Sequence, residues 1–226
     1  TAATAQNHEL LIVGLGTTGG ATFSSPTNSF VIVDQAISGA SDAFLDRIVS
    51  STGTYSTGAT QSISRPWEGV IATFRGRGVY YVSPTGLDTN PGTQALPFQT
   101  IQKAVTLVNP GDTVIVEDGV YTGNNLCGAD QTVVCLTRGG SSTANVTFKS
   151  RNKWGAKVQG QVGVNNAGWR FTSTSNYIRI EGFEVSNVSA ITASGGASGV
   201  QMYSGGNNSQ IVNNNIHDIG KICTDT

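Results

Sequence analysis

The chain has 226 residues, of which only 12% are charged, and its formal net charge is -1 at pH 7. This balance offers no basic surface to a phosphate backbone, which argues against a nucleic-acid partner. No apolar run approaches the roughly 20 residues of a membrane-spanning helix, whereas the 29 glycines and the abundant Thr, Ser, Asn and Val favour β-strands joined by tight turns.

The first third of the chain consists of short apolar segments separated by turn residues. The pattern predicts strands over 9–14, 29–34, 43–50, 54–63 and 67–74. Regular spacing of this kind is typical of an antiparallel β-sandwich, which we expect over 1–76, without its first strand. The closing segment, PWEGVIATFRG, resembles the last strands of small jelly-roll-like modules of secreted carbohydrate-active or surface proteins.

The segment Tyr80–Gly123 contains a strand, a Gly/Pro/Asn turn, a short amphipathic helix, a second turn and another strand. Thr100 is the expected N-cap of the helix, and Asn109-Pro110-Gly111 is expected to end it. The helix presents one apolar stripe, formed by Ile101, Ala104, Val105 and Val108. This order of elements resembles the first coil of a right-handed parallel β-helix of the pectate-lyase-like superfamily, in which a short helix closes the open end. The resemblance implies a β-helix over 79–226.

Later apolar pairs recur at a spacing typical of stacked coils. Ile178 and Ile180 follow Val146 and Phe148 by about 32 residues, and a third pair follows about 31 residues later. The run 213–215 (Asn-Asn-Asn) fits a coil corner, because asparagine tolerates left-handed backbone. About three coils are expected. The last of them leaves Ile219 and Ile222 uncovered, which predicts a longer natural protein or another chain over this end.

Three cysteines are present. Cys127 and Cys135 bracket a short loop, where a disulfide would indicate an oxidising compartment, although two free thiols are the alternative. Cys223 is left over, and its partner is expected to lie outside this sequence.

Asp88 and Asn90 stand at alternate positions of GLDTNPG, which is how some calcium loops begin. The remainder of such a loop is missing, and a structural turn is the competing interpretation. Calcium is therefore a possible cofactor, and no other cofactor is indicated.

The register of the coils indicates a candidate catalytic face. If Ile178 and Ile180 point inward, then Arg179 and Glu181 point outward and Lys149 lies one coil earlier on the same face. The resemblance implies a role for them, since polysaccharide lyases of this fold use a Lys or Arg as the base that removes the proton beside a uronate carboxylate, which a cation, often calcium, neutralises. An ordinary exposed ion-pair strip is the alternative.

Four further residues are candidates. His217, followed by Asp218 at a corner, could serve as an acid or base, or could simply belong to a turn. Trp154, Trp169 and Tyr177 could stack on sugar rings, or could be partly buried coil residues.

The resemblance implies a secreted or cell-surface, polysaccharide-active protein, a lyase or hydrolase of acidic polysaccharides. Two alternatives remain at this point. One is a non-catalytic structural protein that forms a homo-oligomer or filament through the open helix end, and the other is a carbohydrate-binding adhesin.

Overall fold

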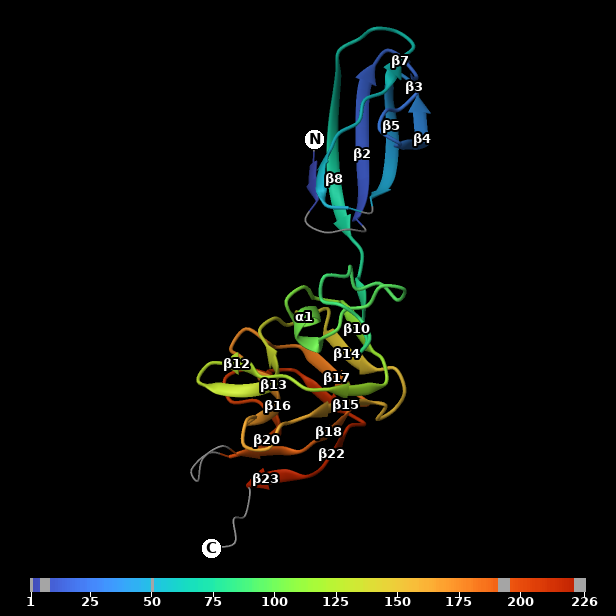
Figure 1. Cartoon of the computed structure of the whole chain (residues 1–226). Helices are drawn as coiled ribbons and strands as arrows, with labels where there is room; N and C mark the ends of the chain where they lie inside the picture. Colours follow the sequence, from blue (N-terminus) through green and yellow to red (C-terminus); the bar gives the residue numbers. More distant parts are fainter. Residues whose placement is uncertain (1, 5–8, 50, 191–195, 222–226) are drawn as a thin grey trace, which may run out of the picture. The chain divides into compact units, whose positions relative to one another are not determined.

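The computed structural model describes residues 2–4, 9–49, 51–190 and 196–221. The chain divides into two compact units, 1–76 and 77–226. Apart from a single short helix, the regular secondary structure of the described residues consists of β-strands (Figure 1). Ile222 and Cys223 lie outside the described residues.

The first unit is built on a four-stranded antiparallel sheet in the order β4-β5-β2-β8. Two short antiparallel pairs, β1-β6 and β3-β7, accompany it. The strands are β1 (Ala2–Thr4), β2 (Glu9–Thr18), β3 (Phe23–Ser24), β4 (Val31–Ile37), β5 (Ala40–Val49), β6 (Gly53–Tyr55), β7 (Thr60–Gln61) and β8 (Trp67–Arg75). One face of the sheet forms a core, because alternate residues such as Leu11, Val13 and Leu45 are buried there, and Phe23 and Tyr55 from the short pairs pack against them. The expected antiparallel architecture is thus confirmed.

The prediction of a single strand over 54–63 is wrong. The segment is divided into β6 and β7, which pair with different partners. Between them the Gly58 amide donates to Thr27 Oγ1 at 2.9 Å, and the Gly58 carbonyl accepts from the Thr27 amide, also at 2.9 Å. These local hydrogen bonds replace the ladder that a continuous strand would need.

The second unit is a parallel β-helix whose coils stack strand on strand (Figure 1). One sheet contains β9, β10, β14, β17 and β21, a second contains β11, β15, β18 and β22, and a third contains β13, β16 and β20. The strands are β9 (Val79–Val82), β10 (Thr113–Val116), β11 (Gly119–Tyr121), β12 (Asn125–Cys127), β13 (Asp130–Leu136), β14 (Val146–Ser150), β15 (Ala156–Gln159), β16 (Ala167–Phe171), β17 (Ile178–Glu181), β18 (Glu184–Ser186), β19 (Val188–Ala190), β20 (Ser198–Gln201), β21 (Gln210–Val212), β22 (Asn215–Ile216) and β23 (Ile219–Lys221). Four successive coils each contribute to the first two sheets, one more coil than expected.

The register of the coils follows the predicted apolar repeat. Val146 pairs with Ile178, and Ile180 pairs with both Phe148 and Ile211. The first four of these side chains are fully buried in one continuous core, which explains why a slip of one residue would be costly.

The corners between the first and second sheets use left-handed backbone. Gly182 has a φ of 78° and Asn213 a φ of 56°, as the asparagine run predicts. The next residue, Asn214, accepts from the Phe183 amide at 2.8 Å and donates to the Ile180 carbonyl at 2.9 Å. The corner at Asn213 is therefore tied to the coil before it.

Helix α1 (Ile101–Val105) closes the core at its first coil. Its expected stripe is buried, and Thr100 caps the helix by accepting from the Lys103 amide. Both predictions are confirmed.

Candidate functional site

A row of polar side chains crosses the outer face of β14, β17 and β21. The strands alternate, so Ile178 and Ile180 point into the core while Arg179 and Glu181 stay partly exposed. The pairing places Lys149 beside Glu181 and Arg179 beside Gln210. We call these four residues the ionic ladder.

Direct contacts join the members of the ionic ladder. Arg179 Nε lies 2.8 Å from Glu181 Oε2, and Lys149 Nζ lies 3.6 Å from Glu181 Oε1. Arg179 Nη1 also donates to Gln210 Oε1 at 2.5 Å. Of the three charged side chains, Lys149 is the most exposed at 48%, against 32% for Arg179 and 22% for Glu181. The structure thus brings together the three residues that the sequence placed on one face.

Electrostatics keep Glu181 ionised. The hydrogen bond from Arg179 is the main cause of a lowered pKa for this carboxyl group, the charges of Arg179 and Lys149 add to it, and partial burial opposes it. With one carboxylate between two cations, the ionic ladder has a net charge of +1. Because it is exposed, the ladder contributes little to folding, but its surplus cation and hydrogen-bonding groups can hold an anionic group.

Lys149 can act as a base only in its neutral form. The ion pair with Glu181 requires the ammonium form of Lys149, whereas a base must first lose that proton. Glu181 itself accepts hydrogen bonds as a carboxylate and has no proton to donate.

His217 lies at the corner between β22 and β23, as the sequence predicts, and is not part of the ionic ladder. Its Nδ1 lies 2.8 Å from Asp218 Oδ2, and its Nε2 lies 3.7 Å from Glu184 Oε1. Glu184 also pairs with Lys157 Nζ at 3.1 Å. The prediction did not include Lys157 and Glu184, although both flank inward-facing valines, Val158 and Val185, and their outward position could have been inferred from strand alternation.

The three aromatic candidates occupy different environments. Trp169 is fully buried between Phe148 and Phe183, with ring centroids 5.6 and 5.1 Å away, so of its two interpretations the structure supports a buried coil residue. Its strand has no clear apolar alternation that would have revealed this. Trp154 is 42% exposed at the corner after β14, and its indole nitrogen donates to the Asn213 carbonyl at 2.8 Å. Tyr177 is half-buried just before β17, at the end of the strands opposite to Trp154.

Asp88 and Asn90 are engaged in local hydrogen bonds. Asp88 Oδ1 accepts from the amides of Gln99 and Thr100, and Oδ2 accepts from Thr100 Oγ1. Asn90 donates from its amide to the Pro97 carbonyl. Within the ranges given above, no three or more His, Cys, Asp or Glu side chains form a group that could hold a metal ion. This donor set does not fit calcium, and the bonds instead tie the loop to the start of α1.

A disulfide joins Cys127 and Cys135. It closes the antiparallel hairpin β12–β13, which leads into the third sheet. In the described part of the chain, no helix has the length and apolar character needed to cross a membrane.

The family model described as "Pel9A-like, right handed beta helix region" matches residues 80–224. The chain belongs to this family. The match confirms the predicted resemblance to pectate-lyase-like β-helices. No curated protein matches the chain.

Several solved structures resemble this member of the family in fold. A rhamnogalacturonan lyase is 20% identical, with 63% of this chain and 37% of that chain covered and a TM-score of 0.47. A GH136 lacto-N-biosidase from Eubacterium ramulus is 19% identical, with coverages of 63% and 27% and a TM-score of 0.47. Pectate lyase Pel9A is 18% identical, with coverages of 64% and 42% and a TM-score of 0.44. This chain therefore spans less than half of each of these structures.

Proposed function

We propose that the chain is part of a polysaccharide-active protein that acts on acidic polysaccharides, with the ionic ladder as the surface that contacts the uronate residues. The observation that supports this most is the stacking of Lys149, Glu181 and Arg179 on the exposed face of a sheet, with one surplus positive charge. Membership of a family named after Pel9A is consistent with such a substrate.

In this proposal the reaction is β-elimination. Arg179 binds the uronate carboxylate through charge-assisted hydrogen bonds, which stabilises the negative charge that develops there. Lys149, after losing its own proton to solvent, takes the proton from the carbon beside that carboxylate. The electron pair of that C–H bond forms a carbon–carbon double bond, the glycosidic C–O bond breaks, and the leaving oxygen takes a proton from solvent to become a hydroxyl group.

An eliminase assay tests this function. The full chain is incubated with pectic, alginate and glycosaminoglycan polymers, with and without calcium, and the ultraviolet absorbance of an unsaturated uronate product is followed. A product signal supports a lyase and names its substrate class. No increase in absorbance with any polymer, together with the formation of new reducing ends, would instead support a hydrolase.

A non-catalytic carbohydrate-binding role is the second candidate. One observation favours it, because Glu181 contacts both cations and neither lysine nor arginine stands as a free base in the ionic ladder. Binding of an acidic polymer without any cleavage would identify this role. Filament formation stays a prediction of the sequence, to be checked by sedimentation of the full chain.

Secretion is part of the proposal. The disulfide between Cys127 and Cys135 supports it, since such bonds persist in oxidising compartments. Detection of the chain in the medium or on the surface of its cells would test this localisation.

A further inference from the structure

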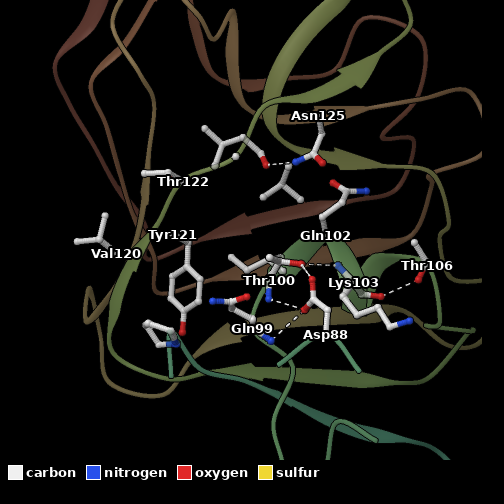
Figure 2. Close-up of a pocket in the computed structure, with 15 residues that line it drawn as sticks. Asp88, Gln99, Thr100, Gln102, Lys103, Thr106, Val120, Tyr121, Thr122 and Asn125 are labelled. Carbon is white, nitrogen blue, oxygen red and sulfur yellow. Dashed lines mark hydrogen bonds between the residues drawn. The ribbon is translucent and has the colours of Figure 1, made fainter. Parts of the chain in front are cut away.

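A cleft of about 570 Å³ lies between α1 and the segment that contains β11, β12 and β13. Figure 2 shows Gln99, Thr100 and Gln102 on one side of the cleft and Val120, Tyr121 and Thr122 on the other. Its volume falls within the usual range for small-molecule sites.

The helix side of the cleft is held by internal hydrogen bonds. The Asp88 carboxylate accepts three of them, from the Gln99 and Thr100 amides and the Thr100 hydroxyl (Figure 2). Gln102 donates to the Cys135 carbonyl at 3.0 Å and accepts from the Cys135 amide at 2.8 Å. The two walls are thus joined through a glutamine side chain.

The opposite wall is fixed as well. Asn125 donates from its side-chain amide to the Val133 carbonyl at 2.6 Å, across the hairpin that the Cys127–Cys135 disulfide closes. A cleft whose walls are held in this way loses little conformational freedom when a ligand binds.

Other polar groups of the cleft are still available to a ligand. The side chains of Gln99, Lys103 and Thr122 make no hydrogen bond or ion pair with any described residue, and all three line the cleft. Because these three side chains take no part in the hydrogen bonds that hold the walls, they can turn to a bound molecule.

The lining selects against most ligand classes. A cation would need a free carboxylate, and Asp88, the acidic residue of the lining, already accepts three hydrogen bonds. A polyanion would need several cations, and among the described residues that line the cleft Lys103 alone is basic. A flat aromatic ligand would need an exposed ring, but Tyr121 is buried and its hydroxyl donates toward the Glu117 and Val82 carbonyls.

We propose that this cleft binds a neutral saccharide. Amides and hydroxyls both donate and accept hydrogen bonds, as sugar hydroxyls do, so the two sets match without any net charge. Val120, which lines the cleft and is half exposed, supplies apolar surface for the C–H face of a sugar ring. This site is separate from the ionic ladder and stands whether or not the chain cleaves acidic polymers.

Titration of the isotope-labelled full chain with neutral tetrasaccharides (cello-, xylo- and galacto-oligomers) and with tetragalacturonate, followed by NMR, tests the proposal. We expect at least one neutral oligomer to shift the amide signals of residues 99–106 and 120–125. Gln99→Ala and Thr122→Val should each weaken that binding about tenfold, because each removes one hydrogen-bonding group. Both side chains are exposed and have no partner among the described residues, so neither change should affect folding.

Gln94→Ala is the matched control, because Gln94 is an exposed glutamine of the preceding loop that does not line the cleft. It should bind as the unchanged chain does. The proposal is overturned if no neutral oligomer shifts these signals, or if Gln99→Ala and Thr122→Val bind as Gln94→Ala does. Tighter binding of tetragalacturonate than of any neutral oligomer, lost in Lys103→Met, would also overturn it.

Discussion

The two faces of the strands β14 and β17 differ in burial and in the kind of side chain that they carry. On the inner face, Val146, Phe148, Ile178 and Ile180 are fully buried and stack directly on one another. On the outer face, charged side chains stack with the same register but remain exposed. The inner face therefore determines the fold, whereas the outer face is nearly free of folding constraints and can be used for binding.

The largest effect should follow from damage to the inner face. Phe148→Ala removes a ring from a fully buried position against Trp169, and should lower the free energy of unfolding by about 3–5 kcal/mol. Urea unfolding measures the change. Thr147→Ala, one residue away on the outer face, should change it by less than about 0.5 kcal/mol, and an equal loss in both variants would contradict the distinction between the faces.

The second largest effect on stability should follow from loss of the disulfide. Reduction of the Cys127–Cys135 disulfide, whose partners are 8 residues apart, should cost about 2–3 kcal/mol of unfolding free energy. Comparison of denaturant midpoints with and without a reductant measures this, and a Cys127→Ser, Cys135→Ser double variant, which does not respond to the reductant, is the control. An unchanged midpoint on reduction would show that the hairpin is held by its hydrogen bonds alone.

The outer face can be tested by binding. Arg179→Ala should weaken the binding of an acidic polymer about tenfold, because a charge-assisted hydrogen bond to a carboxylate is lost. Calorimetric titration at constant ionic strength measures the affinity. Lys157→Ala removes the same charge from an exposed ion pair on the neighbouring sheet, so it separates a local contact from a general effect of charge. Equal losses in the two variants would mean that the ionic ladder is not the binding surface.

The smallest expected effect is the pH dependence of the stability that Glu181 contributes. The lowered pKa of Glu181 means that its pairing stabilises the fold fully above the ordinary carboxyl pKa of 4.5, and that this stabilisation disappears as pH falls through the lower folded-state pKa. Glu181→Gln should remove about 0.5 kcal/mol at neutral pH, and nothing once the carboxyl group is protonated. Unfolding curves across this pH range measure the difference, and a difference that stays constant to the lowest pH would contradict the assignment.

The sequence predicted the residues of the inner face more completely than the arrangement of the outer one. The 32-residue repeat of Val146 and Ile178 was sufficient to predict the register, because burial permits only one alignment of the apolar residues. The same register placed Lys149, Arg179 and Glu181 together. It did not predict the contact of His217 with Glu184, since the direction in which a corner side chain points leaves no periodic signal.

Other features lay beyond the sequence for specific reasons. Trp169 lies in AGWRF, where small and charged neighbours conceal the inward direction of the ring. The pairing of Gln102 with the Cys135 backbone joins residues 33 positions apart, and neither has a pattern that indicates the other. The cleft beside α1 was missed for the same reason.

The most direct test of the central claim is the rate of unsaturated product formation by the full chain, Lys149→Ala and Lys157→Ala on one acidic polymer. If the ionic ladder is the active surface, Lys149→Ala should lose at least about 100-fold in turnover, whereas Lys157→Ala should remain near the rate of the unchanged chain. Equal rates in all three proteins would remove Lys149 from the site, and the absence of product from the unchanged chain on every acidic polymer would contradict the lyase itself.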